Sequence, residues 1–207
     1  MNSFLSKYKA LRNPGKTPEP FTSSKIDPKK LFFVVQKHQA TALHYDFRLE
    51  AGGVMPSWAV PKGPSLDQSV KRLAMKTEDH PLDYRYFEGI IPEGEYGGGT
   101  VMVWDEGNYY PEIETSPGKR KQIKDKKEGE KVMEAGLKKG EIKFLLNGKK
   151  LKGSFALVRI KGFSKTKETW LLIKHKDKFT KPGFDAAKFD FSAKSGRSLN
   201  EIKNSSK

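Results

Sequence analysis

Eight short runs of β-branched and aromatic residues, separated by glycine and proline, most constrain what this chain can fold into. Each run is shorter than a typical helix and has the composition of a β-strand. Antiparallel strands joined by short connections pack as a barrel or a sandwich. We therefore predict a mainly β fold, an antiparallel barrel or sandwich, from the runs FFVVQKH, LHYDFRLE, SWAV, LAMKT, TVMVWDEG, EIKFLLNG, SFALVRI and TWLLIKH.

The segments around these runs divide the chain into three parts. Residues 1–30 are polar and hold four prolines that break regular structure, so we expect a flexible arm that becomes ordered only where it docks. Residues 31–180 contain all the strand runs and form one domain. Residues 181–207 form a polar tail.

Local signals add one or two short flanking helices and a hairpin. The second half of the basic segment 116–140 has apolar residues at helical spacing. Ser198 is followed three residues later by Glu201, which is a capping box for a terminal helix. The pair Asn147 and Gly148 predicts a tight turn between two strands.

Composition and net charge limit which binding partners, site chemistry and cellular location this chain can have. Lysine and arginine outnumber the acidic residues 40 to 25, and the formal charge of +15 favours nucleic acid as a partner, with a merely lysine-rich soluble protein as the alternative. The absence of cysteine excludes thiolate nucleophiles and thiolate metal ligands. No apolar run approaches membrane-spanning length, and the N-terminus lacks the apolar core of a secretory signal. We expect a cytoplasmic monomer with no membrane association.

The run HQATALHYDFRLE places His44, Asp46 and Arg48 at every second position. Successive side chains of a strand point to opposite faces, so these three share one face and the apolar residues between them share the other. His38, on the preceding strand or its turn, approaches them across the ladder. The pattern predicts a polar functional face backed by a core face.

Two imidazoles and a carboxylate suit Mn²⁺, Zn²⁺ or Fe²⁺ better than Ca²⁺ or Mg²⁺, which prefer oxygen ligands. Arg48 lies about two strand rises of roughly 3.3 Å from Asp46, near enough to hold an anion at the metal. A metal beside an arginine suits phosphoryl chemistry. The alternative is a solvated, salt-bridged strand face.

A second polar cluster follows in KTEDHPLDYRYFEG. Pro81 favours an extended His80 at the end of a strand, where functional side chains commonly lie. His80 is a candidate general acid or phosphate donor and Tyr84 a second donor, with a packing histidine as the alternative. GEYGGGT precedes a strand rather than a helix, so it predicts a turn rather than a phosphate-binding loop. His175 is interpreted as structural.

The runs HQATALHYDFRLE, SWAVPKGPSLD and EDHPLDYRYFEGIIPEGEYGGGTVMVWDEG, in this order, resemble the 3′-phosphoesterase domain of bacterial ligase D, an end-processing enzyme of nonhomologous end joining. KGEIKFLLNGKKLKGSFALVRI and TWLLIKHKD extend the resemblance over most of the chain. It implies an enzyme whose fold is an antiparallel β-barrel of about eight strands. The resemblance also implies that its activity depends on Mn²⁺, with Co²⁺ or Zn²⁺ as alternative metals. It also implies two activities at DNA ends: removal of a 3′-terminal ribonucleoside, which leaves a 3′-phosphate, and hydrolysis of that phosphate to a 3′-hydroxyl.

The resemblance assigns roles at matching positions. The expected metal ligands are His38, His44 and Asp46. The residues expected to engage the scissile phosphate are Arg48, His80 and Tyr84. The residues expected to support catalysis are Lys62, Arg72 and Glu78.

The arm element LRNPGKTPEP also resembles the family, whose arm assists ribonucleoside trimming. The resemblance implies that Arg12 and Glu19 bind substrate. Asn13 stands where the family has aspartate, and an amide brings no charge to a metal or a base role. We therefore predict that phosphate removal is retained better than trimming.

The tail stretch SGRSLNEI resembles the segment that connects this domain to the ligase in longer members. Because the chain stops shortly afterwards, we expect a stand-alone enzyme that acts on DNA 3′ ends such as those of a primer-template. A ligase, a polymerase-primase and the end-binding Ku protein are then expected as separate partners.

Two other function classes stay open. One is a noncatalytic nucleic-acid-binding barrel whose exposed aromatic residues stack on bases, unless they fill the core; the candidates are Trp58, Trp104 and Tyr109. The other is a non-haem iron oxygenase, because His44 and Asp46 with a distant histidine match the facial-triad pattern. A basic field fits a phosphorylated polymer better than a small oxidisable substrate.

Overall fold

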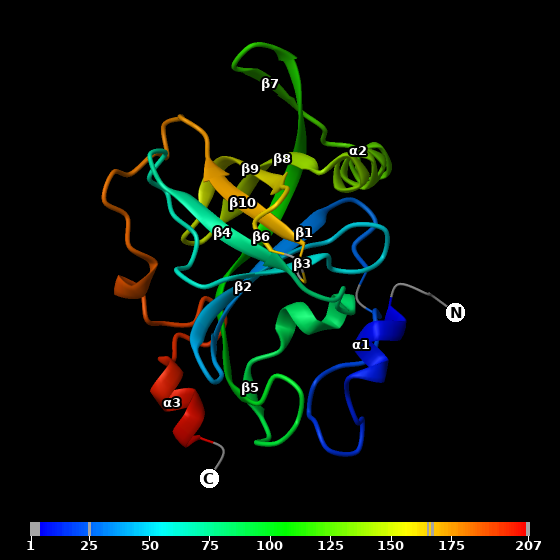
Figure 1. Ribbon diagram of the computed structural model, residues 1–207, viewed down its shortest axis with the longest axis vertical. Coiled ribbons are helices and arrows are strands. Elements are labelled where there is room, and N and C mark those ends of the chain that lie inside the picture. The colour runs from blue at the N-terminus through cyan, green and yellow to red at the C-terminus, as the bar shows by residue number, and fades with distance from the viewer. Residues whose placement is uncertain (1–4, 25, 165, 167, 206–207) are drawn as a thin grey trace.

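Eight antiparallel strands close into a barrel, as predicted, because the first strand pairs with both the second and the sixth (Figure 1). The computed structural model describes residues 5–24, 26–164, 166 and 168–205. In spatial order the barrel strands are β1 (Leu31–Gln39), β2 (Leu43–Leu49), β3 (Ser57–Val60), β4 (Lys71–Lys76), β10 (Thr169–Lys174), β9 (Lys152–Ile160), β8 (Glu141–Gly148) and β6 (Gly99–Ser116). Each of the eight predicted runs corresponds to one of them.

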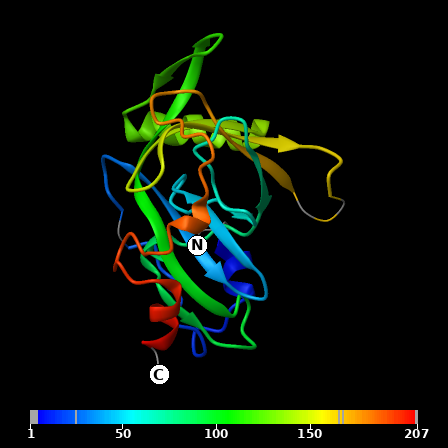
Figure 2. The same ribbon diagram turned by 90° about the vertical axis from the view of Figure 1, so that its left-hand side faces the viewer.

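Two short strands extend the sheet beyond the barrel. β5 (Gly89–Ile91) pairs with the beginning of β6, and β7 (Lys119–Gln122) pairs with its end. β6 is the longest strand and runs almost the full height of the molecule, so the β6–β7 hairpin stands clear of the barrel at the top of Figure 2.

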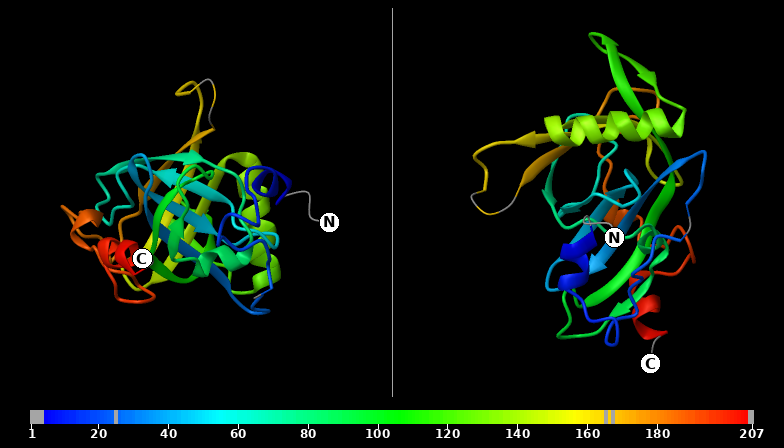
Figure 3. Two further views of the ribbon diagram at one scale, coloured as in Figure 1. Left: turned by 90° about the horizontal axis from the view of Figure 1, so that it is seen from below. Right: turned by 90° about the vertical axis from the view of Figure 1, so that its right-hand side faces the viewer.

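Helices cover the barrel from outside. The helical elements are α1 (Ser6–Ala10), η2 (Leu82–Tyr86), α2 (Lys126–Lys139), η3 (Ala186–Lys188) and α3 (Leu199–Asn204). α2 and α3 lie on opposite sides of the barrel in the left view of Figure 3. The predicted capping box of Ser198 and Glu201 begins α3. No helix in the described part of the chain is long and apolar enough to cross a membrane.

The strand alternation of β2 separates core from site as predicted. Tyr45, Phe47 and Leu49 are at most 3% exposed and belong to the main hydrophobic cluster inside the barrel. The three aromatic residues considered as base-stacking surfaces are also at most 1% exposed: Trp58, Trp104 and Tyr109. Of the two interpretations of these residues, the one in which they fill the core is confirmed, and none of them is available to stack on bases.

The arm contains a helix that the sequence did not predict. α1 ends before the first proline, so proline does not interrupt it. Its Tyr8 is fully buried, packs edge-on against Phe21 and donates a hydrogen bond to the carbonyl of Pro20 at 2.9 Å. Tertiary packing of this side chain stabilises a helix too short to form alone.

The predicted hairpin between β8 and β9 is confirmed, but its turn follows Asn147 and Gly148 and is not formed by them. Asn147 pairs with Lys152 across the hairpin, and residues 149–151 form the connection. No non-glycine residue of the described part of the chain has a positive φ, whereas a two-residue turn of this type needs one at Asn147. The carboxylate of Asp105 instead stabilises the wider loop by accepting three of its backbone N–H groups at 2.8–2.9 Å.

Candidate metal and phosphate site

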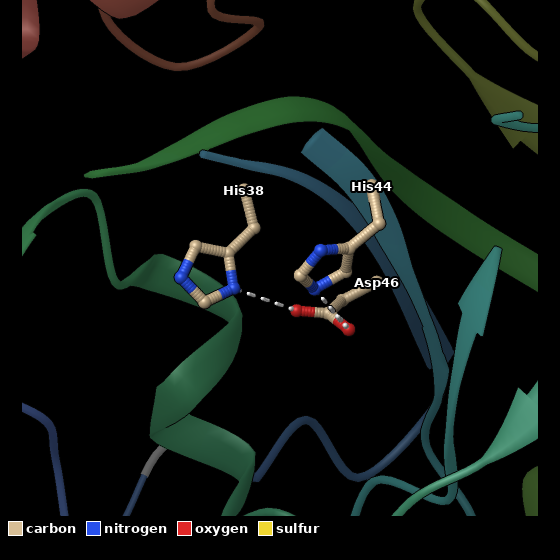
Figure 4. Close-up of side chains that lie close together, drawn as sticks. All are labelled: His38, His44 and Asp46. Atoms are coloured by element: carbon tan, nitrogen blue, oxygen red, sulfur yellow. Dashed lines mark ion pairs between the residues drawn. The ribbon is translucent and has the colours of Figure 1, made fainter. Parts of the chain in front are cut away.

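Three potential metal ligands converge near the turn that joins β1 to β2. The antiparallel register places His38 directly opposite His44 and Gln36 opposite Asp46. One ligand atom from each of His38, His44 and Asp46 lies within 4.8 Å of the others. Figure 4 shows both imidazoles turned toward the carboxylate, with His38 Nδ1 3.5 Å and His44 Nε2 3.7 Å from its oxygens.

The donor set fits a divalent transition-metal ion. His44 Nδ1 lies 2.9 Å from the carbonyl oxygen of Ala42 and donates its proton there, which leaves the Nε2 lone pair facing Asp46. His38 Nε2 is buried and has no hydrogen-bond partner among the described residues. Two neutral imidazoles and one carboxylate are the ligands that Mn²⁺, Fe²⁺ and Zn²⁺ accept.

Arg48 lies beside this cluster and keeps Asp46 ionised. The Arg48 Nη2 atom is 3.1 Å from Asp46 Oδ2, while Nε donates to the side-chain oxygen of Gln36 at 2.8 Å. Burial by itself would raise the pKa of Asp46, but Arg48 and then the two histidines lower that pKa to about 2. The aspartate is therefore a carboxylate throughout the neutral range.

His80 is a neutral ring at neutral pH. Burial, followed by the positive charges of Arg48 and Arg12, lowers the pKa of His80 well below its usual value. Its Nδ1 lies 2.9 Å from the carbonyl oxygen of Glu78 and also 2.9 Å from Arg48 Nη1. Nε2 lies 3.2 Å from Arg48 Nη1 and 3.4 Å from Arg12 Nη2. A neutral ring can accept a proton, and the general-acid role stays a prediction.

The N-terminal arm reaches the site through Arg12. Its guanidinium binds Glu19 at 2.8 Å and Glu78 at 3.0 Å. Glu19 also accepts hydrogen bonds from the Tyr84 hydroxyl at 2.8 Å and from Thr17 at 2.7 Å. Glu19 therefore holds both Arg12 and Tyr84, and its predicted role in binding substrate stays a prediction.

One cavity of about 150 Å³ gathers most of the predicted residues. All of them line it except Glu19, Lys62 and Arg72. Lys62 is exposed after β3, and Arg72 lies on β4 opposite Leu172 of β10. Asn13 is also outside the cavity: it is exposed, and its Oδ1 accepts the N–H of Gly15 at 3.0 Å.

Three further residues of the site were not predicted. Gln36 orients Arg48, and its alternation with His38 on one strand face was an available signal. Tyr8 packs against the His80 ring with centroids 5.1 Å apart, and Tyr96 lines the cavity from the loop before β6. No periodicity marks these two tyrosines, because their positions depend on tertiary packing.

Comparison with known proteins gives one consistent family. Residues 36–159 match the family described as DNA ligase D 3′-phosphoesterase domain. The chain is 46% identical over 178 residues to the multifunctional non-homologous end joining protein LigD of Pseudomonas aeruginosa, covering 84% of this chain and 19% of that protein. Identity to the multifunctional non-homologous end joining DNA repair protein LigD of Mycobacterium tuberculosis is 42% over 159 residues, covering 76% and 18%. The chain spans about a fifth of the length of these relatives, and it belongs to the DNA ligase D 3′-phosphoesterase domain family.

Proposed function

We propose that this chain is a cytoplasmic, metal-dependent enzyme that heals DNA 3′ ends in non-homologous end joining. It would hydrolyse 3′-phosphates and trim 3′-terminal ribonucleosides, so that both reactions lead to a 3′-hydroxyl. The observation that carries this proposal is the cluster of His38, His44 and Asp46 beside the buried guanidinium of Arg48. Family membership and the names of the relatives support DNA ends as the substrate.

Mn²⁺ is the proposed ion, with Co²⁺ and Zn²⁺ as alternatives, and His38, His44 and Asp46 would hold it. When bound, such an ion supplies Lewis-acid stabilisation of phosphoryl oxygens. The cavity of about 150 Å³ holds on the order of five water-sized groups, which suits a phosphate.

The side chains of the cavity would stabilise charge, accept a proton and hold one another in position. Arg48 and Arg12 line the cavity and would offset the charge that develops on the phosphoryl oxygens. His80 would accept a hydrogen bond or proton at Nε2 from the attacking water. The Tyr84 ring holds His80 and Arg48 in place, with its centroid 4.6 Å from the imidazole centroid and 4.8 Å from Arg48 Cζ.

The partners proposed for this reaction are those of end joining. The formal charge of +15 favours association with DNA. A ligase that seals the healed end, a polymerase-primase and the Ku protein are proposed as partners. A pull-down in which none of them associates would weaken that part of the proposal.

The test uses duplex primer-templates whose primer ends in a 3′-phosphate or in one ribonucleotide, with Mn²⁺ or with EDTA. The proposal predicts metal-dependent conversion of the phosphate end to a 3′-hydroxyl. Tight binding without conversion under any divalent metal would instead identify a noncatalytic binding barrel.

An iron-dependent oxygenase is the second candidate, since two histidines and one carboxylate also form a facial triad. Arg12 and Arg48 inside the same cavity favour an anionic substrate over a neutral oxidisable one.

A further inference from the structure

A groove of about 690 Å³ lies next to the metal cavity. Ala40, Ile91 and Gly97 line both spaces, so the two are adjacent. The groove lies between residues 39–41, at the β1–β2 turn, and residues 93–100, the glycine-rich loop that enters β6. The sequence predicted only a turn there.

Gly97 keeps the junction open. Its φ is +78°, which disfavours other residues, and a Cβ at this position would lie 3.9 Å from both His38 Cε1 and Ile91 Cδ1. Any longer side chain would project into the passage between the metal cluster and the groove. Tyr96, the neighbouring residue, lines the cavity side of this passage and is 47% exposed.

The two spaces differ in size. The cavity of about 150 Å³ suits a phosphate, but it is too small to hold both that phosphate and the nucleoside attached to it. The groove of about 690 Å³ lies in the range of about 300–1,000 Å³ that is typical of small-molecule sites. The groove borders the cavity at Gly97, so it is the neighbouring space for a nucleoside whose phosphate lies in the cavity.

The two spaces also differ in charge. The cavity pairs the guanidinium groups of Arg12 and Arg48 with the carboxylates of Asp46 and Glu78, whereas the groove is lined by the carboxylates of Glu93 and Glu95 and by a single cation, Lys203. Carboxylates repel a DNA strand that continues through successive phosphates. A terminal nucleoside has no phosphate beyond the scissile one, so the groove suits this uncharged group.

We propose that this groove is the subsite for the terminal nucleoside that is the leaving group of the trimming reaction. The exposed ring of Tyr96 at the junction would stack on its base or sugar, since aromatic side chains bind bases regardless of sequence. This inference rests on the proposed function and adds the part of the protein that distinguishes a ribonucleoside end from a phosphate end.

The test measures binding by fluorescence anisotropy with EDTA present, so that no turnover is needed. Two primer-templates carry the same 3′-phosphodiester charge: one ends in a ribonucleoside and the other in a methyl group. Two variants are expected to weaken binding of the ribonucleoside end. Tyr96→Ala removes the aromatic ring at the junction, and Thr41→Trp places a large side chain in the groove at an exposed position. The control is Tyr110→Ala on β6, a tyrosine that lines neither space.

Wild type is expected to bind the ribonucleoside end about 10-fold more tightly than the methyl end. Tyr96→Ala and Thr41→Trp are each expected to bring this ratio below about 3, while Tyr110→Ala keeps it. A wild-type ratio near one, or an unchanged ratio in both groove variants that remain folded by circular dichroism, overturns the subsite. Phosphate release with Mn²⁺, measured in parallel, separates the two claims: its absence in wild type contradicts the proposed function instead.

Discussion

The hydroxyl of Tyr84 donates to the buried carboxylate of Glu19 at 2.8 Å, and this hydrogen bond joins the cavity wall to the N-terminal arm. The same carboxylate oxygen accepts from Arg12 Nε at 2.8 Å. Glu19 therefore fixes one residue from the arm and one from the barrel side of the cavity. The arm is part of the site's architecture in this structure.

Glu19→Ala is expected to destabilise the protein by about 2–4 kcal/mol, because it leaves a buried guanidinium with only Glu78 as its carboxylate partner. Urea denaturation gives the free energy of unfolding. Glu114→Ala, which breaks the more exposed ion pair with Lys143, should cost less than about 1 kcal/mol. Equal effects of the two substitutions would show that Glu19 has no special positioning role.

Arg48→Ala is expected to slow phosphate release by about 10²–10³ while the protein stays folded, because the guanidinium no longer offsets charge on the phosphoryl oxygens. The rate is measured at saturating substrate, with circular dichroism as the folding check. Arg159→Ala, on β9 and outside the cavity, is the matched control. A wild-type rate in Arg48→Ala would rule out the clamp.

Wild type is expected to remove a 3′-phosphate more efficiently than it trims a terminal ribonucleoside, and Asn13→Asp is expected to raise the trimming rate. Both side chains can accept the N–H of Gly15 and preserve the turn, so the substitution isolates the added charge. The ratio of the two rates is compared in both proteins. Complete trimming by a low concentration of wild type, or an unchanged trimming rate in the Asn13→Asp variant, would contradict the prediction.

The stability of the barrel should fall between pH 6.5 and about 4 through His175. Burial, then Arg120, Lys143 and Lys174, lowers its pKa from 6.5 to about 4. Between these values the unfolded chain binds more protons than the folded protein, so the free energy of unfolding decreases as the pH falls and levels off below pH 4.

The imidazole is half-buried and Nδ1 lies 2.8 Å from Ser154 Oγ, so solvent screening limits the effect to about 1–2 kcal/mol. Denaturation of wild type and His175→Gln across this pH range measures it. The two stability curves should converge toward pH 4, and curves that stay parallel would contradict the assignment.

Local pattern predicted most of the barrel because each strand is specified by its own residues. β2 shows this best: its alternation separates the core residues Tyr45 and Phe47 from the site residues His44 and Asp46, and its pairing with β1 then brings in His38. The local sequence pattern does not predict positions that depend on tertiary contacts. The helix that carries Tyr8 and the cavity position of Tyr96 both depend on packing between segments that are distant in the sequence.

The family resemblance predicted more of the cavity residues than strand alternation and residue chemistry did, but not all of its predictions lie in the cavity. It predicted Arg12, which lines the cavity from the arm. It also predicted Lys62 and Arg72, which the structure leaves outside this cavity, so their supporting roles stay predictions.

Phosphate release across a Mn²⁺ titration, compared between wild type and His44→Ala, tests the metal site most directly. Activity should rise with Mn²⁺ in wild type, vanish with EDTA, and be lost in His44→Ala even though His44, half-buried at the strand end, can be truncated without opening the core. Equal, EDTA-resistant phosphate release by both proteins would contradict a metal held by His38, His44 and Asp46.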